Sequence, residues 1–212
     1  MEVKLEENIQ KVVEDLTIQI TRKIQNNTTQ YEEILPELND LTALKRRLFY
    51  WLEVGEKLGV AKEKLYKISE IIAYIYLAHE IHRRVLDETV PSERKEIQYR
   101  VLMGDYMYGN FFRELAKADL LQYLAPLARI ILDINEAALL GYEQQNNFRD
   151  ERIFMGQSFA LLGDMAGLPR DTVQELTNFG EKLGEILARL DQKDFKAEVE
   201  LKSLLKNIDY LK

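Results

Sequence analysis

The sequence predicts an all-α protein, a single-domain bundle of about eight helices. Only four prolines and ten glycines interrupt its 212 residues. Apolar residues recur at intervals of three or four along most of the chain, which is the period of a helix with one buried face. No segment shows the alternation of polar and apolar residues between turn residues that is typical of a strand. One domain over residues 1–212 is therefore the simplest organisation.

The expected helices follow one another with short connections. Pro36, Pro91 and Pro169 lie at or near expected junctions, where proline commonly ends a helix. Pro126 falls early in its helix, where proline is best tolerated. Residues 1–36 are expected to form an N-terminal helix and a loop that includes QNNTTQ at 25–30. The expected helical ranges are 4–25, 37–58, 61–87, 92–117, 119–146, 149–167, 170–192 and 195–210.

Composition excludes several classes of function. A net charge of −7 argues against duplex nucleic acid as a partner. The absence of cysteine excludes disulfides, thiol catalysis and cysteine-bound metals. The N-terminal segment carries acidic residues and lacks an apolar signal core, and no run of about 18 apolar residues exists to span a membrane. We therefore expect a cytoplasmic protein that is at most peripheral to a membrane.

The segment AHEIHRRVLDE, 78–88, holds both histidines of the chain. A zinc-protease helix needs histidines four apart with a glutamate after the first, whereas these are three apart and one ligand short of a catalytic zinc site. Along 61–87, one stripe of residues steps by three or four. It consists of Ile68, Ile71, Ile75, His79, His82 and Leu86. Both histidines are therefore expected to face inward, without metal.

The segment 119–146 is apolar around most of its circumference. Its apolar residues include Leu124, Leu127, Ile130, Ile131, Ile134, Ala138 and Leu139. A helix of this kind must be covered on both sides, and in a chain of this length a second subunit is a natural source of the outer cover. The residues predicted at the subunit interface are Ile130, Ile131, Ile134 and Ala138.

Residues 82–88, HRRVLDE, resemble the H-D-D-V-I-D-E motif of trans-polyprenyl diphosphate synthases. His82, Val85, Leu86, Asp87 and Glu88 match this motif, in which aspartates bind Mg²⁺ and, through it, the allylic diphosphate. Arg83 and Arg84 stand where the two leading aspartates belong.

Four further segments resemble the same family in the same order. VLMGDYMYGNFF at 101–112 is similar to the segment after that motif, and ILDINEAALL at 131–140 to the dimer-forming helix. LKRRLFYWLEVGEKLG at 44–59 is similar to a degenerate G-K-R-L-R-P segment, in which Lys45 and Arg46 match. NFGEKLGEILARLDQKDF at 178–195 is similar to the second aspartate-rich motif, but only Asp191 of its aspartate pair remains. Gln192 replaces the other, and Ala188 stands for a glutamine.

These departures resemble the small component of two-component heptaprenyl diphosphate synthases. The resemblance implies a truncated isoprenoid synthase fold and a non-catalytic chain that binds no metal or cofactor. A full-length catalytic subunit, in a heterodimer or larger complex, would hold Mg²⁺ with farnesyl and isopentenyl diphosphates. The chain would complete the complex and help to shape the tunnel for a prenyl diphosphate product, the precursor of a menaquinone side chain.

Physical chemistry agrees with the loss of catalysis. Mg²⁺ takes oxygen ligands, whereas an arginine offers none and repels the ion; unit charges 4 Å apart interact by about 4 kcal/mol at an effective dielectric constant of 20. Two interpretations of the arginines remain open. Arg83 and Arg84, with Lys45 and Arg46, are candidate direct contacts to a diphosphate. Alternatively, Glu80–Arg84 and Arg83–Asp87 pairs make a solvated helix end.

The leading hypothesis is therefore a non-catalytic subunit of a heteromeric long-chain prenyl diphosphate synthase. The second is a stand-alone helical protein that binds a prenyl lipid or a diphosphate in an apolar cavity. A self-sufficient prenyltransferase is disfavoured by the missing ligands. Co-purification of an aspartate-rich subunit would distinguish the first hypothesis from the second.

Overall fold

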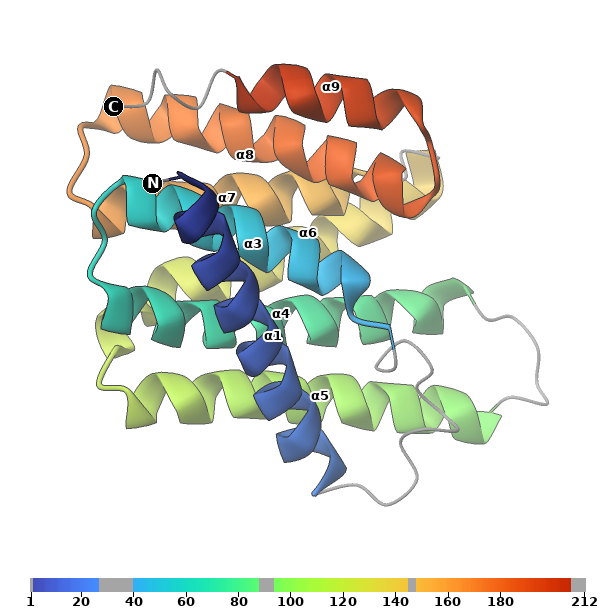
Figure 1. The fold of residues 1–212 in the computed structure, drawn as a ribbon. Helices are drawn as coiled ribbons and strands as arrows, with labels where there is room; N and C mark the ends of the chain where they lie inside the picture. Colours follow the sequence, from blue (N-terminus) through green and yellow to red (C-terminus); the bar gives the residue numbers. More distant parts are fainter. Residues whose placement is uncertain (1, 27–39, 88–93, 145–147, 207–212) are drawn as a thin grey trace. The chain divides into compact units, whose positions relative to one another are not determined.

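A computed structural model describes residues 2–26, 40–87, 94–144 and 148–206. These residues form helices and no strand, which confirms the all-α prediction (Figure 1). In order, the helices are α1 (Glu2–Gln25), α3 (Thr42–Lys57), α4 (Lys62–Asp87), α5 (Arg94–Lys117), the short 3₁₀ helix η3 (Leu121–Tyr123), α6 (Leu124–Gln144), α7 (Arg149–Met165), α8 (Arg170–Asp191) and α9 (Lys196–Leu205). None of them combines the length and the apolar character that a bilayer crossing requires.

One difference from the expected ranges is at the start of α6. The sequence predicts a helix from 119, but Asp119 has a φ of 54°, which a right-handed helix cannot accommodate. The N–H of Leu120 instead donates to the carbonyl oxygen of Leu115, at 3.1 Å, and closes the end of α5. Pro126 therefore lies in the first turn of α6, where its missing N–H costs no hydrogen bond.

The contacts divide the chain into two compact units. The first comprises Met1–Phe49 and Tyr66–Gln122, and the second comprises Tyr50–Leu65 and Tyr123–Lys212. The prediction of a single domain stays a prediction.

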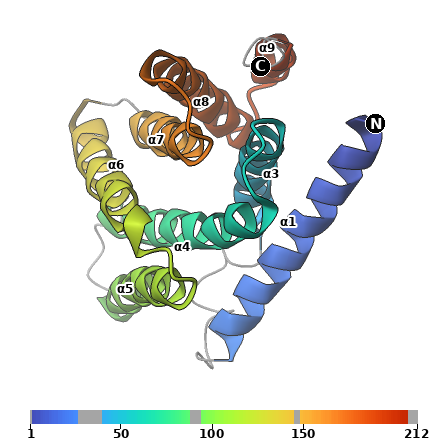
Figure 2. The same ribbon diagram turned by 90° about the vertical axis from the view of Figure 1, so that its left-hand side faces the viewer.

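In the first unit, α1 runs beside α3 and α4 (Figure 2). The inward side of α1 carries Ile9, Val13, Leu16, Ile20 and Ile24, all buried. Every residue of α4 from Ile68 to His79 is buried. This confirms the inward position of the isoleucines and of His79, while His82 is half-buried and the Leu86 side chain lies outside the described set. The helix that is buried on all sides, over residues 68–79, is therefore α4 and not the segment 119–146.

In the second unit, α7 and α8 pack closely through glycines of α8. A Cβ at Gly180 would lie 2.6 Å from the carbonyl oxygen of Met155, and one at Gly184 would lie 2.4 Å from that of Glu151. Both distances are shorter than van der Waals contact, so only glycine allows the two backbones to approach in this way. The indole N–H of Trp51 donates to the carbonyl oxygen of Ser158, at 3.1 Å, and ties α3 to α7.

Candidate functional site

Residues 82–87 of the HRRVLDE segment form the last turns of α4, where His82 lies against α5. The Nε2 atom of His82 lies 3.2 Å from the carbonyl oxygen of Val101 and 3.5 Å from the carboxylate of Asp105. The rings of His82 and Tyr108 meet edge-on, with centroids 5.6 Å apart. Both oxygens are acceptors, so Nε2 donates its N–H and offers no lone pair to a metal. The structure thus brings the HRRVLDE and VLMGDYMYG segments together.

Gly104 makes this contact possible. A Cβ at this position would lie 2.1 Å from Nε2 and 2.2 Å from Cδ2 of His82. No side chain fits there without displacing the imidazole, so the glycine of the G-D-Y sequence serves to receive the histidine. A glycine in the middle of a helix costs stability relative to alanine, and that cost was the one signal in the sequence that a close approach occurs here.

The arginines after His82 lie at the end of α4. Nη2 of Arg83 lies 2.9 Å from Oε1 and 3.1 Å from Oε2 of Glu80. Glu80 thus has a partner three positions on, which shares its helix face, and the expected Glu80–Arg84 pair stays a prediction. Arg84 is exposed. The Asp87 side chain and Glu88 lie outside the described set, so the expected Arg83–Asp87 pair stays a prediction.

This arrangement does not fit a Mg²⁺ ion. A guanidinium held by a carboxylate supplies no oxygen ligand, and its charge opposes that of the cation. Within the described ranges, no three acidic or histidine side chains form a group that could hold a metal. The predictions that this chain holds neither a metal nor a cofactor stay predictions.

Lys45 and Arg46, candidate diphosphate contacts together with Arg83 and Arg84, lie on α3. Nζ of Lys45 lies 2.7 Å from a carboxylate oxygen of Glu14 on α1, and Arg46 is exposed. Lys45 and Arg83 therefore each contact a carboxylate of this chain, and a diphosphate would have to compete with it.

The neighbouring Arg47 was not singled out from the sequence, and it is buried. It donates to the carbonyl oxygen of Ala43, at 2.8 Å, and its guanidinium lies 4.9 Å from the ring centroid of Tyr76. Arg47 thus joins α3 to α4 through a cation–π contact.

The remnant of the second aspartate motif lies at the end of α8. Asp191 is the last residue of that helix and Gln192 follows it, and both are exposed. Nearby, Arg189 binds Asp194 at 2.8 Å and Glu200 at 2.7 Å. Hydrogen bonds from Arg189 and from the Lys196 N–H lower the pKa of Asp194. These contacts hold the turn between α8 and α9, which is a structural role.

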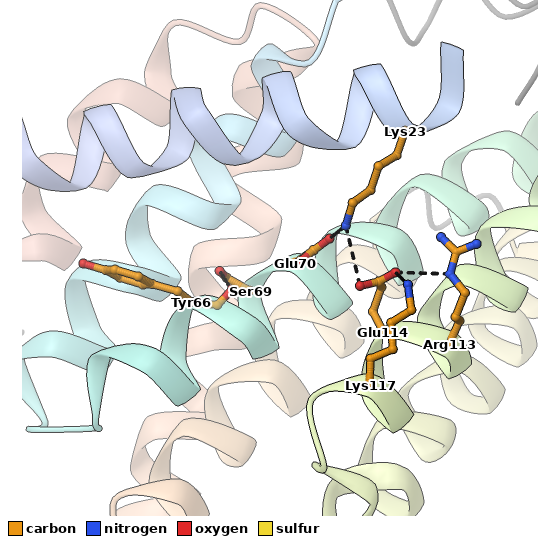
Figure 3. Close-up of polar contacts among 7 residues, drawn as sticks. All are labelled: Lys23, Tyr66, Ser69, Glu70, Arg113, Glu114 and Lys117. Atoms are coloured by element: carbon orange, nitrogen blue, oxygen red, sulfur yellow. Dashed lines mark hydrogen bonds and ion pairs between the residues drawn. The ribbon is translucent and has the colours of Figure 1, made fainter. Parts of the chain in front are cut away.

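A cluster of charges that the sequence analysis missed joins α1, α4 and α5 (Figure 3). Lys23 of α1 pairs with Glu70 of α4 and lies 3.5 Å from Glu114 of α5. Arg113 and Lys117 approach the same Glu114 at 3.2 and 3.3 Å. Both carboxylates are buried. Lys23 and Glu70 are 47 residues apart in sequence, and Glu114 lies on a third helix, so no local pattern could have linked them.

Two pKa shifts follow from this cluster. Burial alone would raise the pKa of Glu114, but the charge of Lys23 and the hydrogen bonds from Lys117 and Arg113 outweigh it and lower the pKa. Burial, followed by the negative charges of Glu70 and Glu114, raises the pKa of Tyr74 well above its ordinary value. Glu114 therefore stays ionised and Tyr74 stays neutral at physiological pH.

The four residues predicted at the subunit interface differ in exposure along α6. Ile130 and Ile134 are buried in the single chain, and Ile131 and Ala138 are half-buried. Leu132 and Leu139 of the same helix are each 56% exposed. The interface over Ile130, Ile131, Ile134 and Ala138 stays a prediction, and a partner that leaves the fold of this chain unchanged would meet Leu132 and Leu139 first.

Comparisons with known proteins agree with the sequence resemblance. In structure, the chain is similar to a decaprenyl diphosphate synthase from Rhodobacter capsulatus, with a TM-score of 0.66 and 18% sequence identity over 88% of this chain. That likeness shows the fold, and the match covers 65% of the length of the synthase. No curated protein matches the sequence.

A family model for heptaprenyl diphosphate synthase subunit 1 matches residues 45–158, which is more than half of the chain. The matched range contains α4 and α5, and with them the contact between His82 and Gly104. The chain therefore belongs to the family of heptaprenyl diphosphate synthase subunit 1.

Proposed function

We propose that this chain is a non-catalytic subunit of a heteromeric long-chain trans-polyprenyl diphosphate synthase. In this proposal a catalytic partner carries out chain elongation and supplies the Mg²⁺ site, in the biosynthesis of an isoprenoid such as a menaquinone side chain. The chain completes the assembly and supports the partner's activity.

The main support for the proposal is the set of side chains at the end of α4. Ionisation of an allylic diphosphate needs carboxylates that hold Mg²⁺ against the departing group. Here Arg83 lies in that place and contacts Glu80, and Nε2 of His82 faces a carbonyl oxygen and a carboxylate. At the second motif, Asp191 is followed by Gln192. Neither position offers the pair of acidic side chains that the reaction requires.

Reconstitution tests the proposal. The purified chain is incubated with farnesyl diphosphate, isopentenyl diphosphate and Mg²⁺, alone and with a full-length synthase subunit that carries both aspartate motifs. We expect no elongation by the chain alone and long-chain product only from the mixture. Elongation by the homogeneous chain would disprove the non-catalytic role. Failure of the two chains to associate would favour a stand-alone binding protein instead.

A further inference from the structure

The outward side of α9 carries the two most exposed large apolar side chains of the described residues. Phe195 is 78% exposed and Val199 is 71% exposed. α9 packs on α8, and Ala197, on the side of α9 opposite to Phe195, is buried. The bonds from Arg189 to Asp194 and Glu200 fix the turn and the helix in place. The exposed phenyl ring is thus presented from a firmly held element.

Lysines accompany these apolar residues on the same side. Phe195, Val199, Lys202 and Lys206 are spaced by four, three and four, so they form one stripe along α9. Lys193 and Lys196 are also exposed near the start of the helix. Asp194 and Glu200 are bound to Arg189, and Glu198 lies at the edge of the stripe. In a chain with a net charge of −7, this face is locally basic.

We propose that this face, made by Phe195, Val199, Lys202 and Lys206, docks α9 onto an anionic membrane surface. An aromatic ring beside lysines is typical of helices that lie at the level of lipid headgroups. The lysine stems can extend along the apolar boundary while their ammonium groups reach the lipid phosphates. Lysine is depleted at interfaces between proteins, so the composition favours a lipid surface over a protein partner.

This proposal does not depend on the role in synthesis, because the purified chain and lipid vesicles are sufficient to test it. Burial of the Phe195 ring should strengthen partitioning about tenfold or more, which corresponds to about 1.4 kcal/mol or more. Electrostatic attraction should weaken with salt, since the Debye length falls from about 10 Å at 0.1 M to about 3 Å at 1 M. We expect reversible binding.

The experiment is co-flotation of the chain with two kinds of vesicle. One is an equal mixture of phosphatidylglycerol and phosphatidylcholine, and the other is phosphatidylcholine alone. We expect preferential binding to the anionic vesicles, which high salt reduces. The double variant Phe195→Ser with Val199→Ser should lose about tenfold or more in partitioning. Replacing Lys202 and Lys206 by Gln should remove the preference for anionic lipid, whereas Glu198→Gln should strengthen it.

A matched control removes exposed apolar groups elsewhere. Leu102 and Leu121 are 66% and 55% exposed, and the double variant Leu102→Ser with Leu121→Ser should bind vesicles like the unaltered chain. Far-UV circular dichroism verifies that each variant is folded. Equal flotation of the α9 variant and the unaltered chain would overturn the proposal, as would no binding to anionic vesicles. If the α9 variant lost association with a catalytic subunit but kept its vesicle binding, the face would belong to a protein partner.

Discussion

At the scale of single residues, the contact between His82 and Gly104 determines how α4 and α5 pack at the first motif. The imidazole occupies the space that a side chain at 104 would fill, with the hypothetical Cβ 2.1 Å from Nε2. At Gly109, on the same helix, nothing lies within 4 Å of a hypothetical Cβ. The two glycines therefore offer a matched test of whether packing or helix propensity decides stability.

We expect Gly104→Ala to lower the free energy of unfolding by about 1–3 kcal/mol, because the imidazole must be displaced. Gly109→Ala should instead raise it by about 0.5–1 kcal/mol, since alanine favours a helix over glycine. Urea denaturation followed by circular dichroism measures both. Stabilisation by Gly104→Ala would show that His82 does not occupy this place.

Lys23 and Lys45 form a second matched pair. Their side chains are 38% and 37% exposed, but the partner of Lys45, Glu14, is 54% exposed, whereas Glu70 and Glu114 are buried. Lys23→Met should cost about 1–3 kcal/mol of unfolding free energy, because the buried carboxylate of Glu70 loses the cation described for it and that of Glu114 loses one of three. Lys45→Met should cost at most about 1 kcal/mol. Equal losses in urea denaturation would contradict this account of the cluster.

The same cluster predicts a pH dependence. The pKa of Glu114 in the folded chain is lowered from its ordinary value of 4.5. This carboxylate therefore contributes stability that is fully present above that value and is lost as pH falls through the lower, folded-state pKa. Lys23→Met removes one cation that lowers the pKa, so the variant should lose less stability than the unaltered chain between neutral and acid pH. Parallel curves of urea midpoint against pH would refute this.

At the scale of the helix, α6 has a buried side, whose residues stabilise the chain, and an exposed side, whose residues are available to another subunit. Ile134 is buried, and Leu132, two positions away, is 56% exposed. Two positions on a helix differ by about 200° in direction, so one substitution can be placed on either side of the same element. A substitution at Ile134 can therefore serve as the control for a substitution at Leu132.

We expect Leu132→Arg to weaken association with a catalytic subunit about tenfold or more while the chain stays folded, as at the centre of an apolar interface. Ile134→Arg should instead unfold the chain or lower its stability by several kcal/mol, because a guanidinium would be buried without a partner. Sedimentation of the mixed subunits measures association, and circular dichroism measures folding. Unchanged association with Leu132→Arg would place the interface away from this side of α6.

The helices themselves were predictable because each carries its own periodic pattern. The stripe that contains Ile68, Ile71 and Ile75 identified α4 and its buried face from local spacing alone. The pattern on α6 was read as evidence for a partner, but it did not show that Ile130 and Ile134 are buried within the single chain. Periodicity shows which residues are buried, but it does not show what buries them.

At the scale of the whole chain, the loss of acidic side chains involves two segments that are about a hundred residues apart in sequence. Arg83 and Arg84 belong to the first, and Gln192 belongs to the second. The sequence identified these residues because they depart from a known motif. It could not identify the contact of Lys23 with Glu70 and Glu114, which depends on how three helices pack.

Restoring one segment should therefore not restore catalysis. We expect the double variant Arg83→Asp with Arg84→Asp to show no Mg²⁺-dependent elongation, because Asp191 is still followed by Gln192. The measurement is product formation from farnesyl and isopentenyl diphosphates, with circular dichroism to verify folding. Turnover by this variant would show that the segment 178–195 has been misinterpreted.

The fit of His82 over Gly104 also constrains how the sequence can vary. A residue larger than glycine at 104 is compatible with the fold only if the imidazole moves or is replaced, so the two positions should change together. Selection for packing alone is then sufficient to keep a histidine at the start of this segment. In a related chain, a histidine opposite such a glycine is consequently no sign that the chain binds a metal, and the acidic side chains of both motifs have to be present before a metal site is inferred.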